Sequence, residues 1–290
     1  MSDPEAISFI LPARNEAAAL RIFLPELESA YPQHEIIVVD DGSEDDTVAV
    51  CKQTGVKCVS HPYPKGNGAA LKTGARVARG DIFVFLDADG QHSVDSVKSL
   101  LNIYHEAEVD MVVGSRSVSG QASWFRAFGN FLYNAFASYI VGHKVKDLTS
   151  GCRVINAQYY RQFIHLLPNG FSAPSTITLA FFRSGLSVVY HPIEVSARIG
   201  RSHLRPIKDG LRFFIILYKL TILYSPLKVF LPIAFLHVLL GFIWWALRYN
   251  FTESLPHLSG VLFVAGVLVF LIGLVSEQIT VLLYQPRKPR

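Results

Sequence analysis

Two acidic residues, Asp87 and Asp89, directly follow the apolar run Ile82 to Leu86 in the sequence IFVFLDADGQH. An isolated carboxylate is costly to bury, so this pair needs a cation, a helix N-terminus or solvent beside it. At the end of a strand, residues two apart project to the same side. With the side-chain oxygen of Gln91 they make a hard oxygen-donor set suited to Mg²⁺ or Mn²⁺, ions often shared with the phosphates of a substrate. The spacing therefore predicts a divalent metal site at a strand end.

The first part of the chain repeats this pairing of an apolar run with a polar cluster. The polar clusters are LPARNE, DDGSEDDT, HPYPKGNGAA, DADGQH and GSR. We predict strands before them over residues 7–11, 35–39, 56–60, 81–86 and 110–114, and helices over 16–29, 45–54, 68–78 and 94–105. This alternation indicates an α/β domain with a mostly parallel sheet, where ligands bind at the carboxyl ends of the strands. Each cluster alone is compatible with ordinary turn or capping chemistry, but all five fall at that edge.

The composition changes near Pro206, after which a chain that is 50% hydrophobic overall becomes almost continuously apolar. We predict three parts: a soluble domain, a juxtamembrane interfacial helix and a transmembrane hairpin with a basic tail, over residues 1–205, 206–225 and 226–290. Bilayers are crossed by about 20 apolar residues, so the spans are expected at about 227–248 and 260–284. Trp244 and Trp245 lie near the end of the first span, as expected for the membrane interface.

Basic residues surround the apolar part. Lys208, Arg212 and Lys219 punctuate the segment before the hairpin, which favours a helix in the membrane interface over a core helix of the soluble domain. The net charge is +4, and cations gather before the first span and in the tail RKPR. Because these cations adjoin apolar sequence, they favour anionic lipid over nucleic acid as partner. The positive-inside rule then predicts a multi-pass protein of the cytoplasmic membrane, with its soluble domain in the cytoplasm.

Cysteine content and the N-terminus agree with that compartment. The three cysteines are odd in number and lack zinc-ligand spacing, which favours a reducing environment. The N-terminal sequence has no basic and apolar segments typical of a signal peptide. Gly266 and Gly273 offer small surfaces for helix packing, and association of copies through the spans stays open.

Six motifs in order resemble one known family. They are ISFILPARNE, IIVVDDGSEDDT, KGNGAALKTGA, FVFLDADGQH, MVVGSR and KDLTSGCRVIN. Together they resemble the successive motifs of inverting family 2 glycosyltransferases with a GT-A fold, and specifically the dolichyl-phosphate mannose synthase-like branch that charges polyprenyl phosphates. The resemblance covers roughly residues 7–208 and implies a Rossmann-like, mostly parallel sheet.

The resemblance implies a role for each matching residue. Contacts to the base and ribose of a nucleotide sugar are assigned to Pro12, Arg14, Glu16, Val39 and Asp41. Contacts to its diphosphate and to the metal are assigned to Asp87, Ala88, Asp89 and Gln91, and Lys65 is expected to bind the nucleotide sugar. Contacts to the phosphate of a lipid acceptor are assigned to Arg116 and Arg126, which complete the catalytic set with Asp89. A surface salt bridge is the alternative for Arg126. A basic loop that closes over the diphosphate is assigned to Arg198 and His203.

Two features depart from the family pattern. Relatives usually have lysine where this chain has His203, so we expect a weaker or pH-dependent diphosphate contact. No Asp or Glu lies between Asp147 and Glu194, although many family members use a carboxylate there as general base. An alcohol acceptor needs such a base, whereas a phosphate monoester with a second pKa of about 6 is already largely dianionic at neutral pH. The gap therefore predicts a lipid phosphate acceptor.

The expected reaction is transfer of a single hexose, mannose or glucose, from a donor of the GDP-mannose or UDP-glucose class to dolichyl or undecaprenyl phosphate. The QxxRW motif of processive polysaccharide synthases is absent from the sequence, and a hairpin is too small for a polymer channel. Two alternatives stay open. One is a glycosyltransferase acting on a hydroxyl lipid such as diacylglycerol, and the other is a non-catalytic nucleotide-sugar-binding membrane subunit.

Overall fold

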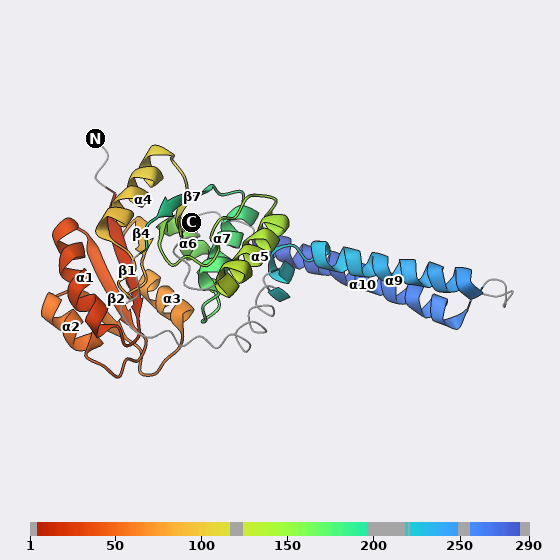
Figure 1. Cartoon of the computed structure of the whole chain (residues 1–290), viewed down its shortest axis with the longest axis horizontal. Coiled ribbons are helices and arrows are strands. Elements are labelled where there is room, and N and C mark those ends of the chain that lie inside the picture. Colours follow the sequence, from red (N-terminus) through yellow and green to blue (C-terminus); the bar gives the residue numbers. More distant parts are fainter. Residues whose placement is uncertain (1–4, 117–123, 196–217, 220, 249–255, 285–290) are drawn as a thin grey trace. The chain divides into compact units, whose positions relative to one another are not determined.

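The computed structural model describes residues 5–116, 124–195, 218–219, 221–248 and 256–284 (Figure 1). Contacts between Cα atoms divide the chain into two compact units. Among the described residues, those up to residue 195 form one unit, and those from 218 to 284 form the other. The predicted interfacial helix lies mostly outside the described residues.

The first unit is built on a seven-stranded sheet with the order β3-β2-β1-β4-β6-β5-β7. Its strands are β1 Ile7–Ala13, β2 Glu35–Asp40, β3 Lys57–Ser60, β4 Ile82–Phe85, β5 Met111–Arg116, β6 Arg153–Asn156 and β7 Val188–Ile193. β6 runs antiparallel to β4 and β5, and the other paired strands are parallel. The prediction of a mostly parallel α/β sheet is therefore confirmed.

Helices cover both faces of the sheet (Figure 1). In chain order they are α1 Ala17–Ala30, α2 Thr47–Thr54, α3 Asn67–Val77, α4 Val94–Glu106, α5 Trp124–Val141, α6 Ala157–Phe163 and α7 Ala173–Arg183. Phe9 and Val38 belong to the core on one face, with residues of α1, α2 and α4. On the other face Ile10 and Val39 pack against Gly74 of α3, where an added Cβ would collide with Ile10. Because both faces are covered, the strands are apolar throughout, as parallel strands usually are.

The reversed strand β6 brings a distant part of the chain to the predicted ligand edge. Arg153, its first residue, pairs with Phe85, the last residue of β4. The loop before β6 therefore lies beside the carboxyl ends of β4 and β5. Arg153 is 2% exposed. Its guanidinium donates to the carbonyl oxygens of Leu148, Ser150 and Pro174 at 2.9, 2.7 and 2.6 Å, so a buried cation fixes this loop.

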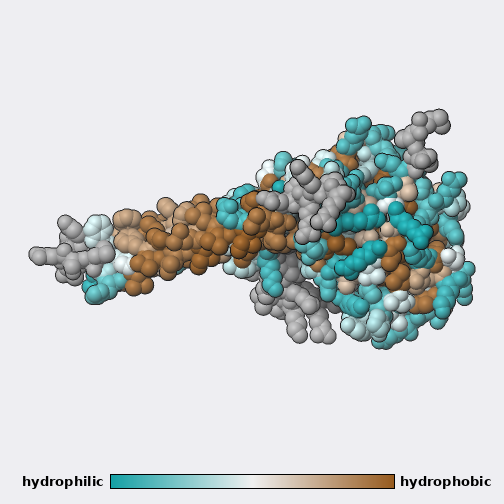
Figure 2. All heavy atoms as spheres, turned by 180° about the vertical axis from the view of Figure 1, so that it is seen from behind, coloured by the Kyte–Doolittle hydropathy of each residue, from teal (hydrophilic) through white to brown (hydrophobic). Residues whose placement is uncertain are grey.

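The second unit contains two long apolar helices, α9 Leu227–Arg248 and α10 His257–Leu283. Their most apolar windows have mean hydropathies of 2.1 and 2.8, and each helix is long and apolar enough to cross a membrane. Figure 2 shows an almost continuous hydrophobic surface along this hairpin. The two predicted spans are therefore confirmed as helices of the expected length and composition.

Small residues let the two helices pack closely. A Cβ added to Gly266 would collide with Val238, and one added to Gly273 would collide with Phe230. These glycines therefore serve contacts within the hairpin, as small residues do between membrane helices. The acidic residue of α10 also has a local role, because Glu277 Oε2 accepts a hydrogen bond of 3.4 Å from the backbone N–H of Leu227. A carboxylate at the start of α9 satisfies an N–H that has no partner within the helix.

Candidate active site

Two of the predicted nucleotide loops are joined by hydrogen bonds. The backbone N–H of Asn15 donates to Ser43 Oγ at 2.9 Å, and the N–H of Glu44 donates back to Asn15 Oδ1 at 2.8 Å. The N–H of Ala17, at the start of α1, donates to Asp45 Oδ2 at 3.0 Å. The loops after β1 and β2 therefore form one surface at the carboxyl edge of the sheet.

The predicted base and ribose contacts lie on this surface. Pro12 and Val39 are Cα partners in the β1–β2 ladder. Arg14 is exposed, and Glu16 is half-buried at the start of α1. The structure thus brings these four residues to one edge, while their contacts with a nucleotide remain a prediction.

Asp41, the fifth predicted contact, is buried and already occupied by protein groups. Its carboxylate accepts backbone hydrogen bonds of 2.8 Å from Lys65 and Gly66 and lies 2.8 Å from His61 Nδ1. The second nitrogen of that ring lies 2.9 Å from Thr73 Oγ1 in α3. Burial raises the pKa of Asp41, but the hydrogen bonds from His61 and the two backbone groups lower it below its usual value. In this structure Asp41 shapes the loop that carries Lys65, and its predicted ribose contact remains untested.

The acidic motif follows β4 in a turn and does not extend the strand. β4 ends at Phe85, and Gly90 takes a left-handed φ of 74°. We expected strand alternation to place Asp87 and Asp89 on the same side. That expectation is wrong in assuming that both residues belong to the strand, because the residues DADG form a turn after the strand has ended. The Asp87 side chain is 41% exposed, whereas Asp89 is 8% exposed as a residue and accepts a 3.2 Å hydrogen bond from the N–H of Gln91.

Asp87 is held as an anion at the mouth of a small cavity. His92 Nε2 lies 3.8 Å from Asp87 Oδ2, and the carboxylate lies against the Cα of Gly151 in the loop before β6. Loss of hydration raises the pKa of Asp87, but His92 and the charges of Arg116 and Arg153 lower it below its usual value. An ionised, partly exposed carboxylate is suited to a divalent cation.

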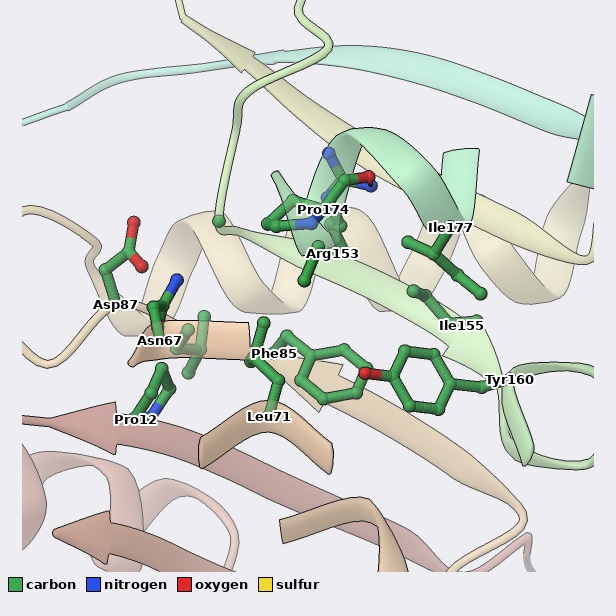
Figure 3. Close-up of a pocket in the computed structure, with 13 residues that line it drawn as sticks. Pro12, Asn67, Leu71, Phe85, Asp87, Arg153, Ile155, Tyr160, Pro174 and Ile177 are labelled. Atoms are coloured by element: carbon green, nitrogen blue, oxygen red, sulfur yellow. Dashed lines mark hydrogen bonds between the residues drawn. The ribbon is translucent and has the colours of Figure 1, made fainter. Parts of the chain in front are cut away.

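The cavity itself is too small for a nucleotide sugar. Its volume is about 20 Å³, which is room for about one water molecule. Figure 3 shows Asp87 and Asn67, the first residue of α3, at one end, with Tyr160 and Ile177 at the other. A nucleotide sugar therefore does not fit inside this cavity.

Asp87 and Asp89 are suited to a metal ion that is also bound by the substrate. Within the described ranges, no group of three His, Cys, Asp or Glu side chains could hold a metal ion. Mg²⁺ and Mn²⁺ are commonly held by one or two carboxylates and completed by phosphate oxygens and water. Asp87 and Asp89 supply two carboxylates of this kind. The predicted side-chain contribution of Gln91 remains a prediction.

The contact between Gly151 and Asp87 gives a specific test. Replacing Gly151 with alanine should weaken Mn²⁺ binding in the presence of a nucleoside diphosphate by about tenfold, because the new methyl group has to displace the Asp87 carboxylate. Titration followed by electron paramagnetic resonance of free Mn²⁺ measures this change. Gly170→Ala is the matched control, because a Cβ at Gly170 meets nothing within 4 Å. Equal Mn²⁺ affinity in the two variants would contradict a metal-binding role for Asp87.

Arg116, the last residue of β5, is held by Asp147, a residue for which we predicted no role from the sequence. Its Nε donates to Asp147 Oδ2 at 2.8 Å, and its Nη2 donates to Asp147 Oδ1 at 3.1 Å and to Thr149 Oγ1 at 2.7 Å. Nη1 donates to no group in the described part of the chain. Burial lowers the pKa of Arg116, but Asp147 raises it above its usual value, with smaller contributions from Asp87 and Asp89. The guanidinium is therefore oriented on one side and can receive an anion on the other.

The remaining predicted residues have different outcomes. Arg126 falls within α5, whose backbone is described there but whose side chain at that position is not. Arg198 and His203 lie outside the described residues. Their predicted contacts with phosphate groups remain predictions.

Sequence reasoning missed Asp147, Arg153 and His92. The motif KDLTSGCRVIN contained the first two, and a charged residue at each end of a Thr-Ser-Gly turn was the available signal. His92 was visible as the last residue of DADGQH, but its contact with Asp87 depends on how the turn folds.

Comparison with known proteins identifies the family. Residues 8–164 match the family described as glycosyl transferase family 2. The chain belongs to this family. Residues 225–282 match a second description, the GtrB C-terminal hairpin, which covers α9 and most of α10.

Relatives of this family 2 glycosyltransferase include enzymes named for mannosyl derivatives of polyprenyl phosphates. It is 30% identical over 208 residues to a polyprenol monophosphomannose synthase from Mycolicibacterium smegmatis, covering 65% of this chain and 77% of the relative. It is 30% identical over 212 residues to an undecaprenyl-phosphate mannosyltransferase from Micrococcus luteus, covering 67% and 86%. These relatives confirm the predicted resemblance and support a glycosyltransferase that is associated with a membrane.

A solved structure shares the fold. Glucosyl-3-phosphoglycerate synthase from Mycobacterium tuberculosis, solved with Mn²⁺, UDP and glucosyl-3-phosphoglycerate, matches with a TM-score of 0.59 and 21% identity. The match covers 75% of this chain and 78% of that protein. The sheet of the first unit is therefore a GT-A-like fold, as predicted.

Proposed function

We propose that this family 2 glycosyltransferase transfers one hexose, mannose or glucose, from a GDP- or UDP-sugar to a polyprenyl phosphate, with inversion at the anomeric carbon. The relatives named above act on polyprenyl or undecaprenyl phosphate, which supports this acceptor class. The soluble domain would lie on the cytoplasmic face and α9 and α10 would cross the membrane, as the basic flanks of the hairpin favour.

The observation that carries the proposal is the oriented guanidinium of Arg116. Asp147 and Thr149 occupy Nε and Nη2, so Nη1 would offer its two N–H donors to an acceptor phosphate. No Asp or Glu lies between Asp147 and Glu194 in the sequence. A phosphate acceptor needs a cation to position it and no base to deprotonate it, because it is mainly dianionic at neutral pH. This combination matches a phosphate nucleophile better than an alcohol.

The other residues divide the remaining tasks. The joined loops after β1 and β2 would bind the base and ribose, and Lys65 would approach the diphosphate from the loop ordered by Asp41. Asp87 and Asp89 would hold Mg²⁺ or Mn²⁺, which when bound neutralises charge on the leaving diphosphate. Arg116, together with Arg126, would align the acceptor oxygen with the anomeric carbon.

Transfer in proteoliposomes tests the proposal. The full chain is reconstituted with undecaprenyl phosphate and supplied with radiolabelled GDP-mannose or UDP-glucose in the presence of Mn²⁺. We expect one donor to yield a lipid product whose sugar is released by mild acid, because a glycosyl phosphate cleaves far more readily than an ordinary glycoside. Diacylglycerol in place of the lipid phosphate is the matched control. An acid-stable product formed from diacylglycerol would instead identify a hydroxyl acceptor, and donor binding without turnover would indicate a non-catalytic subunit.

A further inference from the structure

Two of the three cysteines lie side by side in the first unit. Cys51 belongs to α2 and Cys58 to β3, and these two elements pack against each other. The connection between them is short, because Gly55 ends α2 in a left-handed conformation, with a φ of 76°, and turns the chain into β3. The thiol of Cys51 donates a hydrogen bond to Cys58 Sγ, so the two sulfur atoms are in contact.

The thiols of this pair differ in exposure and in acidity. Cys51 is 0% exposed and belongs to the core, whereas Cys58 is half-buried on β3, an edge strand of the sheet. The hydrogen bond from Cys51 lowers the pKa of Cys58 to about 7, although burial raises it. The same hydrogen bond and burial raise the pKa of Cys51. Cys152, the third cysteine, is 0% exposed and burial raises its pKa, as in an inert structural thiol.

Paired cysteines have two common uses besides packing, and the surroundings favour one of them. A structural zinc site needs four ligands, but within the described ranges no third His, Cys, Asp or Glu side chain joins these two in a metal site. Oxidation instead selects a thiolate that solvent can reach, and a thiol in contact with it then closes a disulfide. In reducing compartments such disulfides are transient and serve redox sensing. Cys58 and Cys51 supply these two roles.

We propose that Cys51 and Cys58 are a redox modification site, at which a hydroperoxide converts the two thiols reversibly into an intramolecular disulfide. The Cys58 thiolate attacks one peroxide oxygen and becomes a sulfenic acid, while the other oxygen of hydrogen peroxide leaves as hydroxide. Cys51 then attacks the sulfur of Cys58, and its proton leaves with the sulfenic hydroxyl as water. Two thiols and one hydrogen peroxide thus yield one disulfide and two waters, and a small dithiol restores both thiols.

The disulfide changes the candidate nucleotide surface, and this part of the inference rests on the proposed function. Its sulfur atoms have to approach to about 2.0 Å, so α2 and β3 are drawn together. The loop before α2 holds the start of α1 through Asp45 and Ala17. β3 leads into His61, whose ring holds Asp41. The loops after β2 and β3 are therefore anchored to the two elements that move.

Mass spectrometry tests the modification. The full chain in detergent is treated with hydrogen peroxide, and N-ethylmaleimide then blocks the remaining thiols under denaturing conditions. Trypsin cleaves after Lys52 and Lys57, so the two cysteines fall on separate peptides. We expect these peptides to be joined by a disulfide that dithiothreitol reverses, while Cys152 carries maleimide. Irreversible oxidation of Cys58 without a disulfide, or oxidation of Cys152 at the same rate, would overturn the proposal.

Substitutions assign the two roles. In Cys51→Ala the reaction should stop at the sulfenic acid of Cys58, which dimedone traps, because no second thiol is in contact with it. In Cys58→Ser the buried thiol of Cys51 should stay reduced at the same peroxide concentration, which also provides a second variant in case the first does not fold. Oxidation of Cys51 in Cys58→Ser at the rate of the unchanged chain would contradict the assignment.

Nucleotide binding tests the consequence. The Kd of GDP and of UDP with Mn²⁺ is measured by calorimetry before oxidation, after oxidation and after reduction. We expect the disulfide form to bind the preferred nucleotide about tenfold more weakly, because its loops leave the arrangement that the nucleotide requires. Cys58→Ser should not respond to peroxide, and Cys152→Ala should respond as the unchanged chain does.

The two parts of the inference fail separately. An unchanged Kd in protein with a fully formed disulfide would overturn the link between the redox site and the nucleotide surface. Absence of nucleotide binding in the reduced protein would refute the proposed function, whereas the disulfide is judged by mass spectrometry alone.

Discussion

Replacing Asp89 with asparagine should lower the rate of sugar transfer by about a thousandfold. The substitution keeps the size of the side chain but removes one of two carboxylates available to a divalent ion, whose stabilisation of developing charge amounts to several kcal/mol. Asp89 is 8% exposed and accepts the N–H of Gln91, a bond that an asparagine oxygen preserves. Single-turnover transfer in vesicles, with saturating donor and lipid, measures the chemical step.

The control for this prediction is another aspartate close in sequence. Asp95 is exposed in the first turn of α4, and Asp95→Asn should retain nearly full activity. Mn²⁺ titration adds a second readout, in which Asp89→Asn should bind the ion more weakly in the presence of the nucleoside diphosphate. Full transfer by Asp89→Asn, or by the unchanged protein after exhaustive chelation, would contradict the metal assignment.

The first half of the sheet could be predicted because its pattern is local. The predicted strands at 7–11 and 35–39 correspond to Ile7–Ala13 and Glu35–Asp40, and the predicted helix at 94–105 corresponds to Val94–Glu106. In a parallel sheet covered on both faces, each strand is a continuous apolar run, and turn residues delimit it. The same locality allowed the two apolar helices of the hairpin to be predicted.

The strands β6 and β7 could not be predicted in this way. β6 is only four residues long, and it begins with Arg153, a residue type that is rarely buried. Its place between β4 and β5 depends on tertiary contacts, including the hydrogen bonds of that guanidinium to Leu148, Ser150 and Pro174. No local pattern contains this information, because the partners lie in separate segments of the chain.

The candidate site was likewise predictable in part. The edge on which Asp87, Asp89 and Arg116 gather followed from strand order and polar clusters. The hydrogen bonds between side chains did not follow from strand order or polar clusters. Arg116 and Asp147 are 31 residues apart in sequence, and their pairing requires both the antiparallel β6 and the loop before it. The turn at Gly90 likewise replaced the strand alternation expected for the two aspartates.

Arg116→Lys should raise the KM for the lipid phosphate by about a hundredfold while leaving the KM for the nucleotide sugar nearly unchanged. A guanidinium binds Asp147 and Thr149 with Nε and Nη2 and still presents Nη1, whereas an ammonium cannot reproduce that planar fork. Transfer to undecaprenyl phosphate in vesicles, measured at varied acceptor and then at varied donor, separates the two constants. Arg79→Lys, at an exposed position, is the matched control.

Asp147 acts through Arg116 and is therefore a positioning residue. Asp147→Asn should give a smaller rise in the acceptor KM, about tenfold, because the amide keeps one acceptor oxygen but can no longer bind two N–H groups of the guanidinium. If the two residues form a unit, the double variant should be no worse than Arg116→Lys alone. Additive losses in the double variant would show that Asp147 serves the site independently. A rise in the donor KM alone would mean that Arg116 binds the nucleotide diphosphate, and the lipid phosphate would then need another cation.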